Sequence, residues 1–192
     1  MKTTASQLKK NILTLSRAFL DQYQEKLHHL PLVEHDEQWP SPCLQEKFDD
    51  RFMCWQPVEI AKSLSFDNIE SALELNIHPS VVEYFTTIFS DSIPATCSEG
   101  HLQLLFAWSE NDFARLQENL IGHVLMKQKL KQEITLFFAV TDDENIMLSV
   151  DNQTGEVWAE RVGCKPHKKI AESLSDFMTS IQPDIYIETA ES

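Results

Sequence analysis

The residues of this sequence with the most capacity for chemistry are its cysteines, histidines and carboxylates, and their spacing matches no easily recognised catalytic motif. The chain contains no GxxxxGK loop, GxGxxG turn, GxSxG elbow or HExxH helix, the motifs of nucleotide, dinucleotide, esterase and zinc-protease sites. The cysteines are scattered without a CxxC pair, which is typical of reduced cytosolic thiols. They are Cys43, Cys54, Cys97 and Cys164. We therefore expect no enzyme activity and no cofactor.

The strongest metal candidates are three histidines near the end of the first predicted helix. His28, His29 and His35 lie close to Glu34, but adjacent histidines point in different directions on a helix. A metal site needs convergent ligands that are themselves held by hydrogen bonds, so solvated histidines are the favoured interpretation and we predict no metal. His123 is expected to be structural or solvated. A small hydrolase or metal-dependent enzyme with a non-sequential site stays open as an alternative.

Carboxylates dominate the charge of the chain. The 192 residues include 30 Asp and Glu against 16 Lys and Arg, which gives a formal net charge of -14. No Lys or Arg occurs between Lys62 and Arg115, a window that contains eight acidic residues. Such a surface repels nucleic acid and anionic lipid and suits a cationic partner. A solvated face is the simpler interpretation for any single carboxylate, but less so for the whole window, because surfaces usually intersperse both signs.

Seven of these carboxylates are predicted to contribute to one acidic groove that binds a partner. Helix N-termini alone explain an acidic residue at the start of a helix, so the prediction depends on convergence in the fold. The predicted contact residues are Glu70, Glu74, Glu83, Asp91, Glu110, Asp112 and Glu118. Each of the four tryptophans is expected in the core, although Trp39 lies in a WPSPC turn where an exposed anchor is an alternative.

Hydrophobic periodicity predicts the elements that must position these residues. Leu8, Ile12, Leu15 and Phe19 belong to one stripe of an opening helix. The predicted helices cover 8–29, 67–77 with Asp67 as N-cap, 79–89, 109–131 and 170–183, and the predicted strands cover 52–56, 101–107, 134–140, 146–150 and 156–161. Within the longest helix, Gly122 is expected to mark a close packing contact. Lys127 is expected near its end, where cations favour the helix dipole.

This order of elements predicts an α+β fold, a single domain with a mixed or antiparallel sheet of about five strands covered by helices. No linker or repeat divides residues 1–192, so we expect one domain with flexible ends at 1–8 and 184–192. The chain shows neither a signal-peptide pattern nor an apolar run near the 20 residues that a membrane span needs. We therefore expect a cytoplasmic protein.

Several segments, taken in order, resemble the Syd family of SecY-interacting proteins. The longest is the block at 108–131, which reads WSENDFARLQENLIGHVLMKQKLK. The others are PSPC at 40–43, WQP at 55–57, HPSVVEYFTTIFSD at 78–91, TLFFAV at 135–140 and TGEV at 154–157. The resemblance runs from about Leu15 to Pro183, and a shared order of several segments is more specific than any one of them.

The resemblance implies an α+β protein with an electronegative concave surface and no catalytic residues. It implies a cytoplasmic protein held loosely at the inner membrane through SecY, which monitors or restrains the translocase. Cytosolic loops of membrane proteins carry excess Lys and Arg, so an acidic groove is a suitable receptor for them. Membrane association then needs no lipid insertion.

Two alternatives use other partners. An immunity-type or general interaction protein would use the same acidic face to neutralise a basic toxin or another cationic protein, which capture experiments would separate from SecY binding. Lipid binding through the opening helix is disfavoured because the rest of the chain is acidic.

Overall fold

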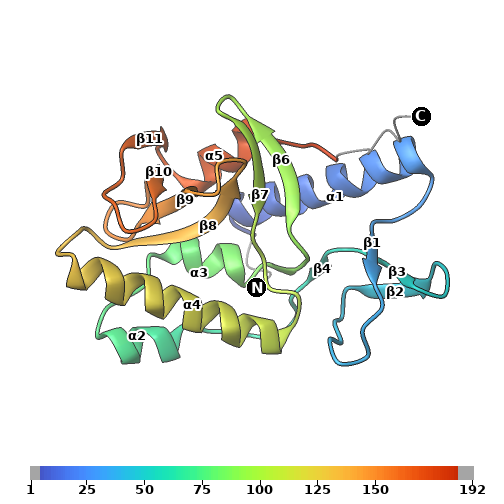
Figure 1. The fold of residues 1–192 in the computed structure, drawn as a ribbon, viewed down its shortest axis with the longest axis horizontal. Coiled ribbons are helices and arrows are strands. Elements are labelled where there is room, and N and C mark those ends of the chain that lie inside the picture. Colours follow the sequence, from blue (N-terminus) through green and yellow to red (C-terminus); the bar gives the residue numbers. More distant parts are fainter. Residues whose placement is uncertain (1–4, 186–192) are drawn as a thin grey trace.

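The alternating apolar segments of the second half of the chain form one large antiparallel sheet. The structure is a computed structural model that describes residues 5–185. The strands are β6 (Ile93–Cys97), β7 (Gly100–Leu104), β8 (Thr135–Thr141), β9 (Ile146–Asp151), β10 (Val157–Arg161), β11 (Lys168–Ala171) and β12 (Gln182–Pro183), in the order β11-β10-β9-β8-β7-β6-β12. Consecutive strands from β6 to β11 lie side by side because short turns or one helix connect them (Figure 1).

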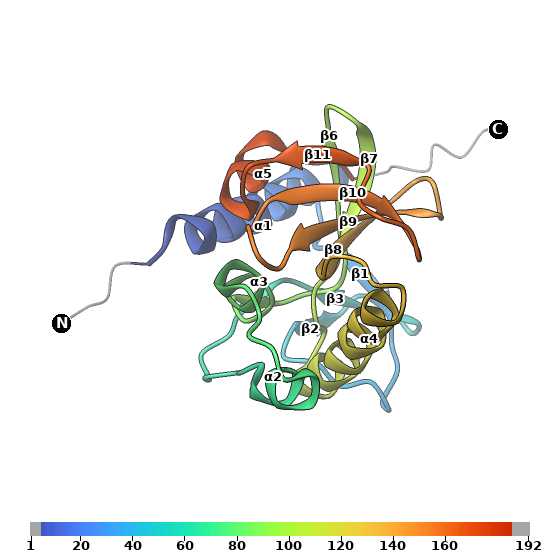
Figure 2. The same ribbon diagram turned by 90° about the vertical axis from the view of Figure 1, so that its left-hand side faces the viewer.

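Among residues 5–185, five helices pack on this sheet and on each other. They are α1 (Gln7–Leu27), α2 (Asp67–Leu73), α3 (Pro79–Phe85), α4 (Glu110–Lys129) and α5 (Leu174–Ser180). Helix α1 contacts α5, α3 and β12. Helix α4 contacts strand β8 and also packs against α2. Figure 2 shows α2 and α4 below the large sheet and α1 beside α5.

Two small sheets complete the fold at the other end of the molecule. The first contains β1 (Leu32–Glu34), β2 (Leu44–Lys47) and β3 (Phe52–Trp55) in the order β1-β3-β2, and the second pairs β4 (Val58–Glu59) with β5 (Ile88–Phe89). Trp55 joins the first of them to the main core, because its ring lies 5.7 Å from Phe19 of α1 and 5.6 Å from Trp108 before α4. Aromatic contacts of this kind fix the lobe of β1, β2 and β3 against the helices.

The predicted fold class is confirmed, with corrections to its elements. The large sheet has seven strands where about five were expected. The final helix is shorter than predicted, because Ile170 belongs to strand β11. Strand β6 was missed since Pro94 interrupts its pattern, and proline normally weakens a strand assignment. Pro94 is accommodated here beside the two-residue strand β12, whose following residue Asp184 donates its backbone N–H to the Pro94 carbonyl.

The two short helices end earlier than predicted. Helix α2 stops where Glu74 adopts the left-handed conformation at φ 51°. Its N-cap is Phe66, not Asp67, and no side chain caps it. Helix α3 stops at Thr86, so residues 88 and 89 are free to pair with β4 as strand β5. The periodicity of residues 79–89 therefore covered both a helix and a buried strand.

One expectation for the longest helix was wrong. Gly122 is exposed, and a Cβ built on it would meet no atom within 4 Å, so no close contact explains this glycine. Lys127 lies in the last turn as predicted. It is also fully buried, because it lies on the same apolar stripe as Leu120 and Val124 and points toward the sheet. Ser109 caps the helix, since its Oγ accepts a hydrogen bond from Asp112 N.

The expected flexible ends lie partly outside the described residues. Residues 1–4 and 186–192 are not among the described residues. Of the remainder, Leu8 is buried within α1 and Ile185 is buried after β12.

Candidate partner-binding seam

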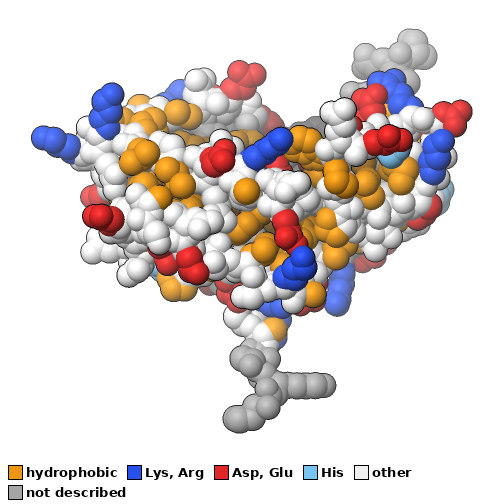
Figure 3. All heavy atoms as spheres, turned by 90° about the horizontal axis from the view of Figure 1, so that it is seen from below, with side chains coloured by type: hydrophobic (Ala, Val, Ile, Leu, Met, Phe, Trp, Pro, Cys, Tyr) orange, Lys and Arg blue, Asp and Glu red, His pale blue; other side chains and the backbone are white. Residues whose placement is uncertain are grey.

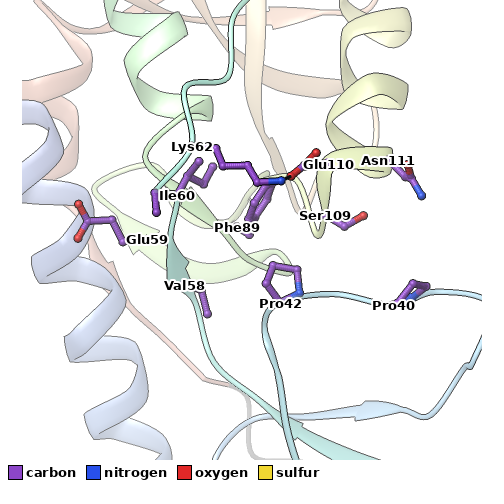
Figure 4. A pocket seen from close by; sticks show the side chains of 11 residues that line it. Pro40, Pro42, Val58, Glu59, Ile60, Lys62, Phe89, Ser109, Glu110 and Asn111 are labelled. Carbon is purple, nitrogen blue, oxygen red and sulfur yellow. Dashed lines mark hydrogen bonds and ion pairs between the residues drawn. The ribbon is translucent and has the colours of Figure 1, made fainter.

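A pocket of about 460 Å³ lies where β4, β5, the loop at 40–42 and the start of α4 meet (Figure 4). Most of its wall is apolar. The apolar residues of the wall are Pro40, Pro42, Val58, Ile60, Ala61 and Phe89. The polar residues that line the pocket are Glu59, Lys62, Ser109, Glu110 and Asn111. Across one side of it, Lys62 Nζ lies 2.6 Å from Glu110 Oε1. An apolar hollow with a few polar groups is the usual form of a ligand site in proteins.

Backbone pairing holds the pocket wall in place. Val58 pairs with Phe89 between β4 and β5, and Ile60 N donates to Thr87 O at 3.0 Å. The proline loop is fastened to the segment before α4, because Ser41 Oγ donates to Trp108 O. These contacts join residues far apart in sequence into one preformed surface.

Two smaller hollows continue from this pocket. One of about 60 Å³ shares Pro40, Ser109 and Asn111 with it and adds Trp39 and Arg115 among its walls. The next, of about 380 Å³, shares Trp39 and extends over the sheet formed by β1, β2 and β3. We call this row of three hollows the seam. It runs between the small-sheet lobe and the start of α4.

Trp39 stands between the second and third hollows. Its side chain is 39% exposed, and the Arg115 guanidinium lies 4.1 Å from the centre of its ring. Such a stacked cation contributes about 0.5–1 kcal/mol at an exposed site. Trp39 is thus one of the exposed large apolar side chains, as the alternative for the WPSPC turn expected, whereas Trp55 and Trp108 are buried.

Acidic groups outnumber basic groups in the lining of the seam. The lining carboxylates are Glu34, Asp36, Glu59, Glu110 and Asp112, and the lining cations are Lys62 and Arg115. Two of the acids also pair with cations from outside the lining, Glu34 with Arg51 at 3.0 Å and Glu59 with Lys9 at 2.6 Å. Seen from below, hydrophobic side chains gather between the larger body and the small lobe, with acidic and basic side chains around them (Figure 3).

Three of the seven predicted contact residues lie at or beside the seam. Glu110 and Asp112 line it. Asp91 interacts electrostatically with Asp112. Loss of water around the Asp91 carboxylate raises its pKa, and the negative charge of Asp112 raises this pKa further. The hydrogen bond from the Ser92 N–H acts in the opposite direction. Like charges held near each other disfavour full ionisation and favour the approach of a cation.

The other four predicted residues lie on helices and line none of the three hollows. Glu70 Oε1 accepts from Ile77 N at 2.9 Å, so this residue has a local structural role in the turn after α2. Glu74 is exposed at the end of α2, and Glu118 is exposed on α4, against which α2 packs. Glu83 on α3 accepts a hydrogen bond from Ser6 Oγ, next to the start of α1.

Sequence reasoning missed three acidic residues of the seam and one buried ion pair. Glu34, Asp36 and Glu59 lie outside the cation-free window, and only the fold brings them to the seam. Lys127 Nζ lies 2.5 Å from Glu160 Oε2, and neither side chain has any exposed surface. The placement of Lys127 in the stripe of Leu120 and Val124 was the available signal for its burial.

Hydrogen bonds surround the buried carboxylate on both oxygens. Lys127 Nζ also donates to Cys164 O at 2.8 Å, and Glu160 Oε1 accepts from Thr135 Oγ1 and Ser149 Oγ, each at 2.7 Å. Burial acts to raise the pKa of Glu160, but the hydrogen bonds from His123, Lys127, Ser149 and Thr135 outweigh burial and lower it to about 2. The group lies under α4 and ties this helix to the large sheet.

The described residues show no cluster with the ligands of a metal. Within 5–185, no group of three or more His, Cys, Asp and Glu side chains is placed to hold an ion. His28 instead ends α1 in the left-handed conformation, and His123 is buried against Thr135 Oγ1 at 3.1 Å. In the same range, no helix combines the length and apolar character that crossing a bilayer requires.

Comparison with known proteins gives a consistent result over nearly the whole chain. A family model described as Syd protein (SUKH-2) matches residues 9–183, a range that includes the whole seam. The chain is 52% identical to Protein Syd of Colwellia psychrerythraea, over 94% of this chain and 95% of that protein. It is 39% identical to Protein Syd of Pseudoalteromonas atlantica, with 95% and 98% covered. The identity to Protein Syd of Pectobacterium atrosepticum is 38%, with 90% and 96% covered.

Proposed function

Because this chain belongs to the Syd family, we propose that it is a non-catalytic protein that binds the basic cytosolic loops of the SecY channel. The seam and the acidic residues around it form the receptor surface. The observation that carries this proposal is the lining of the seam, in which five carboxylates face two cations. Binding restrains or monitors the assembly of the translocase, and it holds an otherwise cytoplasmic protein at the inner membrane.

Electrostatics explains why such a surface selects this partner. Cytosolic loops of membrane proteins are enriched in Lys and Arg, and a chain of net charge -14 attracts them. Attraction of this kind accelerates encounter and excludes wrong partners more than it adds affinity. The screening length at physiological salt is about 8 Å, so only loops that fit the seam keep the full interaction.

The predicted contact residues divide into two groups under this proposal. Glu110 and Asp112, with Asp91 beside them, receive the basic loop directly. Glu70, Glu74, Glu83 and Glu118 extend the negative surface over the neighbouring helices α2, α3 and α4.

Charge reversal with matched controls tests the proposal. The seam variant carries Glu34→Lys and Glu110→Lys, which are exposed. Asp112 and Glu70 are left intact because their carboxylates accept backbone N–H groups of Trp108 and Ile77. The control variant carries Asp142→Lys and Glu144→Lys, exposed residues of the turn between β8 and β9. It changes the net charge by the same amount.

We expect capture of SecY from detergent-solubilised inner membranes to fall about tenfold or more for the seam variant and to stay near wild type for the control, because the lost pairing acts at contact distance. A third variant, Glu74→Lys with Glu118→Lys, measures the contribution of the helices. Equal capture by the seam variant and wild type would contradict the proposal. Recovery of a soluble basic protein without translocon subunits would favour the alternative of a neutralising protein.

A further inference from the structure

The pocket at the β4 end of the seam has a form that charge attraction alone does not require. We propose that it is an anchor site for one apolar side chain of a basic partner segment, and that Lys62 holds the place of the partner's cation at Glu110 until the segment binds. This inference rests on the proposed function, since it concerns the same surface. It adds the side-chain pattern that the surface recognises and a contact within the chain that competes with the partner.

The shape of the pocket supports an apolar occupant. Its volume of about 460 Å³ is within the usual range of ligand pockets, roughly 300–1,000 Å³. Phe89 and Ile60 are buried in its wall and are held by the β4–β5 pairing. A rigid wall costs little ordering on binding. An aliphatic side chain placed here would remove apolar surface of both partners from water.

The ion pair at the edge of the pocket supports an exchange of cations. Lys62 and Glu110 are 48 positions apart in sequence, and their side chains are 75% and 53% exposed. Figure 4 shows Lys62 reaching from the segment after β4 to Glu110 at the start of α4, in front of Phe89. Exposed pairs of this kind contribute little stability. A cation of the partner can therefore replace Lys62 at small cost, and Lys62 then extends into water.

The distance between an apolar anchor and a cation follows from extended backbone geometry. Residues two positions apart face the same side of an extended segment. A leucine in the pocket therefore brings a basic residue two positions away toward Glu110 on one side. Glu59 marks the other side of the pocket, where Lys9 pairs with it at 2.6 Å. The recognised pattern is thus an apolar residue with Arg or Lys two positions before or after it.

A peptide measures this site without SecY. The probe is the capped peptide GRGLGRG, and its partner is GRGGGRG, in which glycine replaces leucine. Titration calorimetry at low salt gives the dissociation constants for the wild-type protein. We expect the leucine peptide to bind about tenfold more tightly, which is the order expected for burying part of a leucine side chain. Equal affinity for the two peptides would overturn the anchor.

Filling the pocket provides a second measurement. Ala61 lines the pocket and is exposed, so Ala61→Trp should place an indole over the opening without disturbing the core. We expect this variant to lose the preference for the leucine peptide. Ser98→Trp adds the same side chain at an exposed position in the turn between β6 and β7, and it should keep the preference. A preserved preference in both variants would overturn the placement of the anchor.

Removing Lys62 tests the exchange. Lys62→Met frees Glu110 and should raise affinity for the leucine peptide about 2- to 5-fold, the worth of an exposed ion pair. Lys168→Met breaks a comparable exposed pair with Glu99 and changes the net charge equally, so it should raise affinity less. Equal or lower affinity for Lys62→Met than for Lys168→Met would show that Lys62 does not compete with the partner.

The two proposals fail in different ways. Normal dependence of SecY capture on the seam, together with equal binding of both peptides, would overturn the anchor and leave the SecY proposal standing. A leucine preference that Ala61→Trp removes and an affinity that Lys62→Met raises, together with SecY capture that is unchanged in the seam variant, would support the anchor as a site for another basic protein.

Discussion

At the scale of single residues, the buried pair of Lys127 and Glu160 joins α4 to the large sheet. Neither side chain has any exposed surface, and four side chains form hydrogen bonds with the Glu160 carboxylate. A satisfied buried pair adds little net stability, whereas removing one partner leaves an uncompensated buried charge. The pair therefore specifies how α4 sits on the sheet more than it strengthens the core.

Loss of the cation should be strongly destabilising. We expect Lys127→Met to lower the free energy of unfolding by about 3–5 kcal/mol, measured by urea denaturation. The double variant Lys127→Met with Glu160→Leu should recover a large part of this loss, since no buried charge is left. Lys129→Met, two positions away on the exposed side of α4, is the control and should change stability little. A small effect of Lys127→Met would mean that Glu160 is neutral in the folded protein.

The same carboxylate predicts how stability depends on pH. Folding lowers the pKa of Glu160 from 4.5 to about 2, so its contribution is complete above pH 4.5 and is lost as the pH falls toward 2. The integrated contribution is about 3 kcal/mol. Urea denaturation at successive pH values should show this decline, and Glu160→Gln should have a shallower one. Asp49, Glu99 and Asp143 also have lowered pKa values, so a residual slope is expected in that variant.

At the scale of elements, two glycines differ in whether the fold requires a residue without a side chain at their position. Gly122 lies in the middle of α4 with open space around it. Gly155 lies in the turn before β10 at φ +79°, and a Cβ there would come within 2.5 Å of the His78 ring. His78 in turn caps α3 and donates its N–H to Asn152 Oδ1 at 2.8 Å. The second glycine thus permits the turn to pack against the start of a helix.

Alanine substitution should separate these two roles. We expect Gly122→Ala to raise the free energy of unfolding by up to about 1 kcal/mol, because alanine is the better helix former. Gly155→Ala should lower it by about 1–3 kcal/mol, since the residue needs a positive φ and the new methyl group meets the His78 ring. Thermal unfolding of both variants checks the signs. Destabilisation by Gly122→Ala would indicate a contact at this position that the structure does not contain.

Short strands explain why the elements were only partly predictable. Helix α4 and strands β8, β9 and β10 have long apolar patterns, and these were found close to their actual bounds. Strands β4, β5 and β12 have two residues each. Such segments become strands only because a partner strand is already in place. The sequence of β11 resembles the start of the helix that follows it, so β11 was predicted as part of that helix. Local propensity is too weak to identify them.

At the scale of the whole molecule, the charges of the seam come from segments that the fold brings together. Glu34 and Asp36 come from the small lobe, Glu59 from β4, and Glu110 and Asp112 from α4. A field made by several such groups extends further than that of a single carboxylate and steers cationic partners toward the seam.

This field should appear in the kinetics of binding. We expect the association rate of the leucine peptide with the wild-type protein to fall about tenfold between low salt and 1 M salt, where the screening length is about 3 Å. The dissociation rate should change less, because contact in the pocket determines it. Stopped-flow fluorescence with a labelled peptide gives both rates. The seam variant should start from a lower association rate and show a weaker salt dependence, and an unchanged salt dependence would contradict steering by the seam.

The sequence was sufficient to predict the α+β class, the main helices, the core strands and the acidic balance, because these follow from local periodicity and composition. It also carried the family resemblance, through several segments in order. The sequence did not reveal which carboxylates pair with which lysines. Lys62 reaches Glu110 across 48 positions, Lys9 reaches Glu59, and Lys127 turns inward to Glu160. Contacts of this kind depend on how the chain closes between distant segments, which no local pattern of residues contains.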